Sequence, residues 1–486
     1  MTTAIDYVNA PPHIGHLYEK LCADAIARYY RLKGYDVFFL TGTDENASKN
    51  AKAAEEVGIP VKEFVDRNAA KFIQLCQLFN ISFDYFIRTT EEKHANFVRE
   101  VFKKIYEKGE IYKGIYRGLY CPLCEEFKGE EDLIDGKCPE HGVEVEYLEE
   151  ENYFFRLSKY QTKILELLEK NFIIPEKRKH EVLERVRRGL KDISITRPNL
   201  TWGIKAPVKE EHTIYVWVDA LFNYISAIYP ENLKYWPADV HLIGKGINWF
   251  HSVLWPALLL AAGFELPKKI VVHGYLNIEG KKISKSAGNF IDPFELAQKY
   301  EVDSIRYFFL RNFPMFEDGD FREELLRERN NTELVANIGN FVYRVLSFTF
   351  TKFDGKVPQP QELNEEDQRL VGEINQIPKL VGEEIEGFRL NRALEKINEF
   401  AISCNQYFQA KRPWKTLDPN SIYLGMNAVR SLAILLAPFT PSSSQKLWRQ
   451  LNLKGSIQEE GWDSASELRI FPGHIINRPE PLFKKL

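Results

Sequence analysis

The order of segments at the N-terminus constrains the fold of this chain more than any other feature. Met1 to Val8 is short and mostly apolar, and Pro11-Pro12 end it. A helix is predicted from about His16 to Leu32, where apolar residues recur at helical spacing, and Gly34 ends it. The apolar run Val37 to Leu40 follows directly. Strand, helix and strand in this order predict the beginning of a parallel α/β sheet.

Three later apolar runs predict the second half of the same sheet. They are Tyr215 to Val218, His241 to Gly244 and Ile270 to His273, and helical segments separate them. Short, continuously apolar strands are typical of parallel sheets that are covered on both faces. Before them, from Gly114 to about Val145, glycine, cysteine, proline and acidic residues alternate with short strand-like pieces. This change in composition predicts an insertion that splits the sheet.

Beyond about Asp292 the chain is predicted to be helical. A stripe of apolar residues runs along Thr332 to Phe350, and Leu390 to Lys411 and Ser421 to Ala437 show similar patterning. Such segments favour a helical bundle. We therefore expect the first half of the sheet domain at 1–113, the insertion at 114–212, the second half of the sheet at 213–291, a linking region of helices at 292–332 and a helical domain at 333–486.

The formal net charge of −4 excludes a strongly basic protein that coats nucleic acid, although a local RNA-binding patch remains open. The N-terminus has no charged region followed by an apolar run, so no signal peptide is predicted. The apolar stretch Val253 to Ala262 is too short to span a membrane. We expect no membrane association and a cytoplasmic location.

A candidate anion site opens the first predicted helix. His13-Ile14-Gly15-His16 follows the first strand, and free amides at a helix N-terminus, together with the helix dipole, attract phosphate. Gly15 has no side chain, so a flat base can lie against the backbone. His13 and His16 could both donate to phosphate oxygens. Taken alone, two unrelated histidines near a turn would explain the pattern equally simply.

A lysine-rich loop supports the nucleotide interpretation. Lys281-Lys282-Ile283-Ser284-Lys285-Ser286 follows a predicted strand and the turn Glu279-Gly280. Lysines in such a loop suit the stabilisation of charge that develops on a leaving pyrophosphate. A basic surface turn would be the favoured interpretation if this loop stood alone. Together with the histidine motif, it predicts a site for a nucleoside triphosphate.

Two short hooks in the insertion predict a metal site. Cys121-Pro122-Leu123-Cys124 and Cys138-Pro139-Glu140-His141 each place two potential ligands close together. Three thiolates and one imidazole favour Zn²⁺, and four protein ligands indicate a structural site without a catalytic water. Such an ion would stiffen an insertion too small to build its own core. Unrelated cysteines are the alternative.

The two motifs resemble the signatures HIGH and KMSKS of class I aminoacyl-tRNA synthetases, with Ile283 in place of the usual Met. Further segments are similar to the methionyl-tRNA synthetases, in their short bacterial form with one zinc knuckle: Ala4–Asn9, Thr41–Glu45, Asp192–Arg197, Tyr215–Ala220 and Val272–Tyr275. The resemblance runs from the N-terminus to about residue 450. It implies a Rossmann-like parallel sheet, split by a zinc-binding insertion and followed by an all-α anticodon-binding bundle.

The resemblance also implies the reaction. L-methionine would be activated with ATP and Mg²⁺ to methionyl-adenylate and then transferred to the 3′ end of tRNA(Met), both initiator and elongator. By the resemblance, the catalytic residues would be His13, Gly15, His16, Lys282 and Lys285, and ATP would also contact Glu19, Gly244 and Ser284. One Zn²⁺ would be held by Cys121, Cys124, Cys138 and His141.

The same resemblance implies the two recognition sites. The methionine side chain would lie among Ala4, Ile5, Tyr7, Trp217, Ala220, Leu221, Tyr224 and His273. Asp44 would receive the ammonium group, and Arg197 would hold Asp44. Asn340 and Arg344 would read anticodon bases while Trp414 stacks on one of them. Without the resemblance, Arg344 would be a solvated charge and the aromatic residues would be ordinary packing.

Two departures from the family pattern affect the site. The chain has Asn46-Ala47 where the family usually has His-Gly, and Gly246 where the family usually has an aspartate thought to contact the ribose. The ribose contact is therefore an open question. The isoleucine, leucine and valine enzymes carry a large editing insertion, and no segment here is long enough to be one.

Three other functions remain as alternatives. They are another class I synthetase, a synthetase-like RNA-binding protein without catalysis, and a nucleotidyltransferase that uses no RNA. The intact His13, His16 and Lys285 speak against the second, and Asn340, Arg344 and Trp414 speak against the third. Because the chain stops soon after the bundle, without the extra C-terminal domain that some relatives use to dimerise, we expect a monomer.

Overall fold

The computed structural model describes residues 1–123, 126–139, 142–198, 200–283 and 290–486. The chain divides into two compact units. The first, which we call the sheet unit, comprises Met1–Pro12, Leu40–Gln74 and Phe83–His273. The second, the helical unit, comprises His13–Phe39, Leu75–Ser82 and Gly274–Leu486. The first helix, which carries the histidine motif, is thus grouped with the helical unit.

A six-stranded sheet forms the centre of the sheet unit. Its strands are β1 (Thr2–Tyr7), β2 (Leu40–Asp44), β3 (Tyr85–Arg88), β7 (Ile173–Ile174), β12 (His241–Gly244) and β13 (Ile270–His273). Their order is β3-β2-β1-β12-β13-β7, and every neighbouring pair is parallel. The predicted parallel sheet is therefore confirmed. Successive strands are added outward in opposite directions from β1 and β12, and ligands bind at such a switch point, beyond the carboxyl ends of the strands.

The strand predicted at Val37–Leu40 is displaced, because β2 spans Leu40–Asp44 and includes only the last residue of that run. Another predicted strand is wrong. Tyr215 to Val218 is not a strand, because helix α7 spans Val216–Leu221. The strand in this region, β11 (Lys209–Ile214), ends just before it and pairs antiparallel with β9 (Thr196–Arg197) and β10 (Lys205–Ala206). β-branched and aromatic residues favour strands only where they can pack on a sheet, and the tertiary context overrides that preference here.

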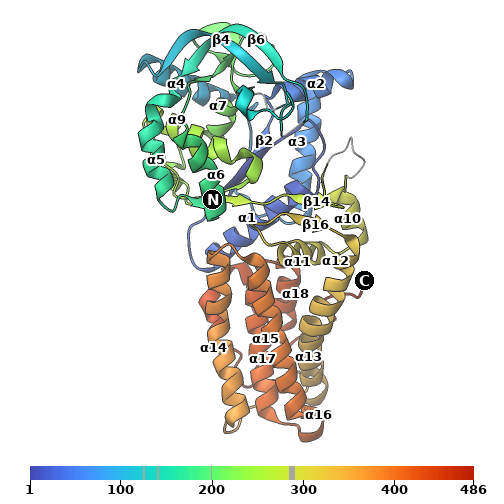
Figure 1. Ribbon diagram of the computed structural model, residues 1–486. Helices are drawn as coiled ribbons and strands as arrows, with labels where there is room; N and C mark the ends of the chain where they lie inside the picture. The colour runs from blue at the N-terminus through green and yellow to red at the C-terminus, as the bar shows by residue number, and fades with distance from the viewer. Residues whose placement is uncertain (124–125, 140–141, 199, 284–289) are drawn as a thin grey trace. The chain divides into compact units, whose positions relative to one another are not determined.

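The insertion contains a small antiparallel sheet. Its order is β5-β4-β6-β8, built from β4 (Ile111–Cys121), β5 (Glu126–Lys128), β6 (Glu146–Phe155) and β8 (Ile193–Ser194). The long ladder between β4 and β6 runs from Ile111 opposite Phe155 to Tyr120 opposite Glu146, and Figure 1 shows these two strands curving side by side. The change in composition after Gly114, which predicted the insertion, thus falls within β4 of this small sheet.

Helices cover the sheets of this unit. They are α2 (Ser48–Glu56), α4 (Glu92–Glu107), α5 (Gln161–Glu169), α6 (Glu176–Arg187), α7, α8 (Asn223–Ser226) and α9 (Trp255–Ala262), with most of α3 (Val61–Leu78). The apolar run Val253–Ala262 comprises the last two residues of the π-helical segment Phe250–Leu254 and all of α9, and it is almost entirely buried. Among the residues described, no helix combines the length and hydropathy that crossing a membrane requires.

The helical unit begins with α1 (Ile14–Leu32) and continues after a small sheet of order β15-β14-β16. Its other elements are β14 (Leu276–Ile278), β15 (Lys281–Lys282), β16 (Gly319–Phe321), α10 (Pro293–Lys299), α11 (Val302–Asn312), α12 (Glu323–Arg329), the π-helical segment Asn330–Gly339, α13 (Asn340–Lys352), α14 (Glu365–Glu386), α15 (Leu390–Lys411), α16 (Pro413–Thr416), α17 (Pro419–Leu436) and α18 (Pro441–Gln450). In Figure 1, α13, α14, α15 and α17 stand side by side as a bundle. The predicted bundle is confirmed.

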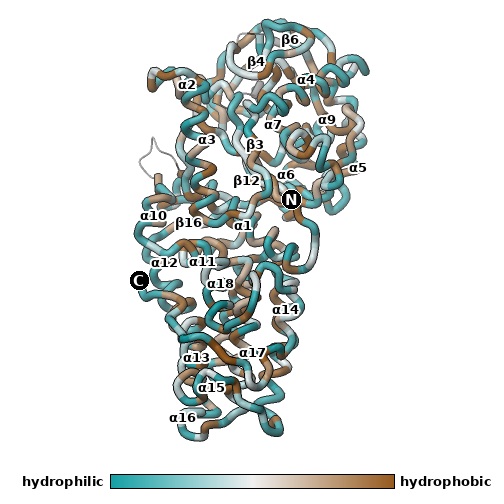
Figure 2. Tube along the Cα trace, turned by 180° about the vertical axis from the view of Figure 1, so that it is seen from behind, coloured by the Kyte–Doolittle hydropathy of each residue, from teal (hydrophilic) through white to brown (hydrophobic). Residues whose placement is uncertain are grey.

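The hydropathy of the bundle follows its packing. Along α14 in Figure 2, hydrophilic and hydrophobic stretches alternate, as expected of a helix with one buried face. Helix α17 is different, because nearly all of its residues are buried. It packs against α13, α14 and α15. An apolar central helix with amphipathic neighbours gives the bundle a continuous core.

A buried ion cluster fixes α1 within the helical unit. Arg306 on α11 donates to the carboxylate of Asp24 at 2.6 Å and to the carbonyl of Phe79 at 2.8 Å. Arg28 donates to the same carboxylate at 2.8 Å. Burial by itself would raise the pKa of Asp24, but the guanidinium groups of Arg28 and Arg306 hold it below its usual range. The helix that carries the histidine motif is therefore tied to the start of the helical region.

Candidate functional site

The histidine motif forms the N-terminus of α1. His13 is the N-cap residue, and its Nδ1 accepts a hydrogen bond from the amide of Gly15 at 3.0 Å. The amide of His13 donates in turn to Nδ1 of His16 at 3.1 Å. The two imidazoles stack with ring centroids 3.8 Å apart and an interplanar angle of 21°. The predicted pair of histidines is thus brought together by a capping box.

These hydrogen bonds indicate the protonation of both rings. A neutral imidazole that accepts at Nδ1 carries its hydrogen on Nε2, so each ring presents Nε2–H as a donor. Burial, with Lys20 adding to its effect, lowers the pKa of His16 to about 3. His16 is therefore neutral at physiological pH. Two neutral donors at a helix N-terminus suit phosphate oxygens.

The lysine-rich loop begins in a hairpin of the helical unit. β14 pairs antiparallel with β15, and the backbone of Lys282 lies opposite Asn277. Glu279 and Gly280 form the turn with φ of 52° and 72°. Ser284 and Lys285, two of the predicted site residues, lie outside the residues described. The loop resumes at Phe290.

The loop starts and ends beside the histidine motif. A Cβ placed on Gly15 would lie 3.8 Å from Cδ1 of Ile283 and only 2.9 Å from Cε1 of His13. The ring of Phe290 packs edge-on to that of His13. Any side chain at position 15 would therefore press on the first imidazole, which explains the need for glycine there.

Two further predicted ATP contacts differ in position. Glu19 is buried in α1, where Lys20 donates to its carboxylate at 3.4 Å. Gly244 is the last residue of β12, and Gly246 lies in the short turn Lys245–Ile247 that follows. Gly244 is thus at the carboxyl edge of the sheet, the expected place for a ligand.

The same edge gathers several of the residues predicted to bind methionine. Tyr7 ends β1 and Asp44 ends β2, and the two are paired directly in the sheet. Ala4 and Asp44 are buried, and Ile5 is partly buried on the same strand. The ammonium group of Lys49 lies 3.0 Å from the centroid of the Tyr7 ring. The β1–β2 edge therefore offers an aromatic ring beside a carboxylate.

An aromatic cluster in the sheet unit contains most of the other predicted residues. Trp217 on α7 stacks on Phe250 with ring centroids 3.8 Å apart and an interplanar angle of 4°. His251 lies edge-on to Trp217 at 6.3 Å. Its Nδ1 lies 3.0 Å from the carbonyl of Ile247 and its Nε2 lies 2.7 Å from the Tyr224 hydroxyl. Because a carbonyl only accepts, Nδ1 donates, and a neutral ring then accepts the Tyr224 hydroxyl at Nε2.

Trp217, Ala220, Leu221 and Tyr224 are all buried, on α7 and α8. The indole N–H of Trp217 has no hydrogen-bond partner among the residues described, although it is buried. A buried donor without a partner is costly in a folded protein. The indole N–H of Trp217 is therefore a donor in this cluster that a ligand or a water molecule would satisfy.

The sequence interpretation missed His251 and Phe250. Both lie in Trp249-Phe250-His251, which follows β12 after the short turn Lys245–Ile247, and this aromatic run soon after a strand is the signal that could have found them. His273, which was predicted instead, is buried at the end of β13 and pairs with Gly244 of β12. Its role stays a prediction.

Arg197 lies on β9 of the sheet unit. Its guanidinium donates to the carbonyl of Thr196 at 2.8 Å and to the carbonyl of Ser194 at 3.2 Å. It also lies over the ring of Tyr215, 4.2 Å from its centroid. These contacts hold the side chain firmly, and its predicted pairing with Asp44 stays a prediction.

Two of the four predicted metal ligands are described. Cys121 ends β4, and it and Cys138 are both fully buried. The amide of Cys138 donates to Val143 at 2.9 Å, and its carbonyl accepts from Gly142 at 2.7 Å, so the chain turns back on itself here. Cys124 and His141 lie outside the residues described. Within the described part of the chain no group of three or more metal-binding side chains occurs.

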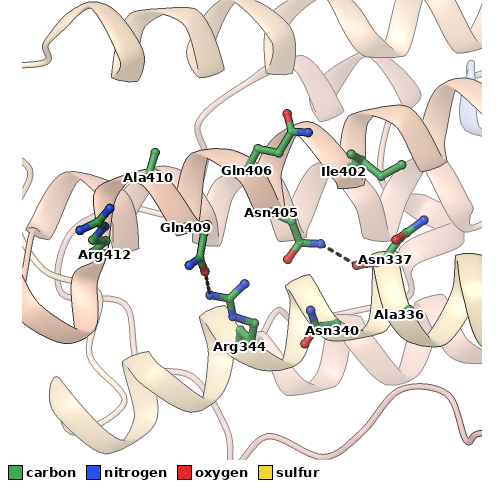
Figure 3. Close-up of a pocket in the computed structure, with 10 residues that line it drawn as sticks. All are labelled: Ala336, Asn337, Asn340, Arg344, Ile402, Asn405, Gln406, Gln409, Ala410 and Arg412. Carbon is green, nitrogen blue, oxygen red and sulfur yellow. Dashed lines mark hydrogen bonds between the residues drawn. The ribbon is translucent and has the colours of Figure 1, made fainter.

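A cleft of about 560 Å³ opens along the bundle. The π-helical segment and α13 form one wall, and α15 forms the other (Figure 3). The lining residues are Ala336, Asn337, Asn340, Arg344, Ile402, Asn405, Gln406, Gln409, Ala410 and Arg412. Two of the three predicted anticodon residues, Asn340 and Arg344, thus share one cleft.

Side chains from α15 organise this cleft. Arg344 donates to Oε1 of Gln409 at 2.9 Å, and Asn405 donates to the carbonyl of Asn337 at 2.9 Å. The Arg344 guanidinium also lies 5.4 Å from the ring centroids of Phe408 and Trp414. Trp414 is 42% exposed. The third predicted residue, Trp414, therefore lies close to the second, Arg344, and is partly exposed to solvent.

Family models match most of the chain. The family described as tRNA synthetases class I (M) matches residues 1–147 and 141–346. The anticodon-binding domain of tRNA ligase matches residues 367–478. The first match covers the sheets, both motifs and the π-helical segment, and the second covers most of α14 and all of α15 to α18.

Characterised relatives match the chain over its full length. The methionine–tRNA ligase of Thermotoga maritima is 43% identical over 504 residues, covering 100% of this chain and 80% of the relative. The methionine–tRNA ligase of Brucella suis is 40% identical over 502 residues, covering 100% of this chain and 97% of the relative. A structure of Mycobacterium tuberculosis methionyl-tRNA synthetase in complex with methionyl-adenylate superposes with a TM-score of 0.95 at 39% identity, covering 99% of this chain and 98% of that one.

Proposed function

Because this chain belongs to the class I methionyl-tRNA synthetase family, we propose that its two motifs activate methionine in the way their geometry suggests. The reaction is that of a methionine–tRNA ligase, with ATP, methionine and transfer RNA as substrates. The roles of individual residues, the zinc ion and the RNA contacts are the parts that we propose.

The first step forms methionyl-adenylate. A carboxylate oxygen of methionine attacks the α-phosphorus of ATP, a new P–O bond forms, and the bond to the β-phosphate oxygen breaks to release pyrophosphate. His13 and His16 donate from Nε2 to phosphate oxygens, while Lys282 and Lys285 neutralise the charge that develops on pyrophosphate. Mg²⁺ accompanies ATP. The stacked, neutral pair of imidazoles is the observation that carries this proposal.

No side-chain nucleophile is needed, since positioning and charge stabilisation are sufficient for such a displacement. In the second step, a hydroxyl of the terminal ribose of the transfer RNA attacks the methionyl carbonyl, and AMP leaves. Gly15 leaves room for the base beside His13. The contact of Gly244 with ATP stays a prediction. Glu19, whose carboxylate accepts from Lys20 at 3.4 Å, would contact the ribose from α1.

The methionine side chain would bind in the aromatic cluster of the sheet unit. Sulfur makes favourable contacts with aromatic rings, which Trp217 and Phe250 supply. Tyr224 is the hydroxyl that would face the thioether, and His251 fixes its orientation through the 2.7 Å hydrogen bond. Asp44, buried beside Tyr7, would receive the ammonium group. His273 and Arg197 would support this site from β13 and β9.

A Zn²⁺ ion would be held by Cys121, Cys124, Cys138 and His141. The two described cysteines fit this assignment, because both are fully buried in the insertion and the backbone of Cys138 is hydrogen-bonded to Gly142 and Val143. With four protein ligands, the ion would supply stiffness to the small antiparallel sheet and take no part in the reaction.

The cleft of Figure 3 would receive anticodon bases. Bases in single-stranded loops are read through their edges and by stacking. Arg344 and Asn340 would donate to base edges, and Trp414 would stack on one base, which is worth about 1–3 kcal/mol. Oδ1 of Asn405 is buried without a partner among the residues described, so it could accept from a base amino group.

One pair of assays tests the whole proposal. Pyrophosphate exchange with a panel of amino acids should show activity with methionine far above leucine, isoleucine or cysteine. Charging of both initiator and elongator transfer RNA should follow. Exchange with a different amino acid as the best substrate would contradict the assigned pocket. A monomer and a cytoplasmic location stay predictions, which light scattering and cell fractionation would test.

A further inference from the structure

A buried carboxylate lies on α7, the helix that carries part of the proposed methionine pocket. Asp219 is on α7, between Trp217 and Ala220, and its side chain is 1% exposed. A buried carboxylate needs hydrogen-bond donors. Each oxygen of Asp219 receives one from a different element: Nε2 of His94 on α4 lies 2.6 Å from Oδ1, and Nδ2 of Asn46 donates to Oδ2 at 2.8 Å.

The loop that carries Asn46 is itself held in place. The carboxylate of Glu45 accepts from Arg88 at 2.6 and 2.9 Å and from the Thr43 hydroxyl at 2.8 Å. The amide of Glu45 donates to the Thr89 hydroxyl at 2.8 Å, and its carbonyl accepts the indole N–H of Trp202 at 2.7 Å. The loop after β2 therefore cannot shift without breaking several buried hydrogen bonds.

The amide group of Asn46 connects this loop to α7. One N–H donates to Asp219 and the other to the carbonyl of Thr89 at 3.0 Å. Asp44, two residues earlier, is the proposed partner of the substrate ammonium group. Trp217 and Ala220, on either side of Asp219, belong to the proposed side-chain pocket. The Asn46–Asp219 hydrogen bond thus joins the two ends of the methionine site within the sheet unit.

We infer that Asn46 is a positioning residue that sets amino-acid discrimination, because it fixes the distance between Asp44 and the pocket on α7. This inference rests on the proposed function, since it takes Asp44 and Trp217 as parts of the methionine site. An amino acid that is shorter than methionine, or branched, fits a pocket at a fixed distance poorly. If α7 can move relative to Asp44, the preference for methionine over such amino acids decreases.

The chain has Asn46 where related synthetases usually have histidine, and either side chain supplies an N–H donor to Asp219. This allows a graded set of variants. Asn46→Ala removes the donor, Asn46→Asp places a second carboxylate against Asp219, and Asn46→His keeps a donor. Asn46→Ser keeps a shorter donor and a smaller cavity, so it provides the same test if the alanine variant does not fold.

The experiment is pyrophosphate exchange with methionine, homocysteine and leucine. We expect Asn46→Ala to lower kcat/KM for methionine at least tenfold and to reduce its preference over homocysteine by about tenfold, while KM for ATP changes less than twofold. Asn46→Asp should lose more of the preference for methionine than Asn46→Ala, and Asn46→Ser should lose less. Asn46→His should retain more than half of the preference of the unmodified protein. This order follows from the number of donors that remain to Asp219 and, for Asn46→Asp, from the repulsion between two carboxylates.

A matched control separates discrimination from stability. Asn68 is similarly buried in the same unit and donates to the carbonyl of Val8 at 2.7 Å. Asn68→Ala should lower the melting temperature and leave the preference for methionine as in the unmodified protein. If Asn46→Ala, or the serine variant, also changes only the melting temperature, the inference is overturned.

A second variant distinguishes this failure from a failure of the proposed site. Trp217→Phe keeps an apolar ring but changes the proposed pocket wall. If it leaves the methionine kinetics unchanged, the pocket is misplaced and the inference falls with it. If Trp217→Phe changes those kinetics and Asn46→Ala does not, only the inference falls.

Discussion

The ring of Phe290 packs edge-on against the imidazole of His13, with centroids 6.2 Å apart and an interplanar angle of 79°. Ile283, at the other end of the lysine-rich loop, lies close to Gly15. The two motifs are far apart in the sequence, yet both ends of the loop are anchored beside the first histidine. Ile283 and Phe290, the described residues on either side of 284–289, thus both lie at the N-terminus of α1.

Removing His16 should slow the first step strongly. Its Nε2–H is a preorganised donor, and the loss of one such donor costs about 10²-fold or more in rate. We therefore expect His16→Ala to lower kcat for pyrophosphate exchange by roughly that factor while KM for methionine changes little. His180→Ala, at an exposed position on α6, serves as the control. An unchanged exchange rate would remove His16 from the mechanism.

The low pKa of His16 also predicts a pH effect on stability. An unfolded histidine takes up a proton below about pH 6.5, whereas His16 in the folded protein does so only near pH 3. Between these values the unfolded state binds more protons, so His16 disfavours the folded state increasingly as the pH falls. His16→Gln removes this effect. The melting temperature of the variant should therefore rise relative to the unmodified protein as the pH falls from 6.5 to 4, with no trend above pH 7.

His180→Gln provides the comparison for that measurement. Its ring is 65% exposed, so its substitution should give no comparable trend. A melting-temperature difference for His16→Gln that is independent of pH, or that grows above pH 7, would contradict the prediction. Because other groups titrate in the same range, the difference between variants is the informative quantity.

Much of the fold could be predicted because the patterns are local. The strands at 241–244 and 270–273 and the helices of the bundle follow from hydrophobic periodicity. The histidine motif could be placed at a helix N-terminus because a proline pair separates it from the strand. Hydrophobic periodicity does not predict that the rings of His13 and His16 stack, and the structure shows this.

The remaining features depend on contacts between distant residues. The run Tyr215–Val218 has strand-like composition, and only its packing makes it part of α7. His251 could not be chosen over His273 from spacing, because its contacts with Trp217 and Tyr224 arise from the way α7 and α8 meet the segment after β12. The pairing of Asn46 with Asp219 is invisible in the sequence for the same reason.

Trp414 should affect the charging of transfer RNA and should not affect the formation of methionyl-adenylate. Its side chain is exposed and lies near Arg344. Since base stacking contributes about 1–3 kcal/mol, Trp414→Ala should lower kcat/KM for charging by roughly five- to a hundredfold. Pyrophosphate exchange should be spared. Tyr343→Ala removes an equally exposed aromatic ring from α13, outside the cleft lining, and should change neither assay. Equal losses in both steps would count against an anticodon role.

The zinc assignment predicts a defined metal content. Metal analysis of the purified protein should find about one zinc per chain. Cys138→Ser should lose the metal and lower the melting temperature, because the ion stiffens the small sheet. Cys404→Ser changes a cysteine that is equally buried in α15 and should retain the zinc. A fully folded protein without metal would show that the two hooks have another role.

Gln409 should act on transfer RNA through Arg344. It accepts from the Arg344 guanidinium at 2.9 Å, so it holds that group in one orientation along the cleft. We expect Gln409→Ala to lower kcat/KM for charging about three- to tenfold without affecting pyrophosphate exchange, which corresponds to the loss of roughly one hydrogen bond. Arg344→Ala should cost more, because it removes the donor itself.

A double-mutant cycle separates this role from general support of the bundle. If Gln409 acts only by orienting Arg344, then Gln409→Ala should have almost no further effect once Arg344 is alanine. Gln406, which lines the same cleft from α15, supplies the matched comparison, and its alanine variant should combine additively with Arg344→Ala. Additive losses for Gln409 as well would mean that it contacts the RNA independently, or supports the helix, and does not position the arginine.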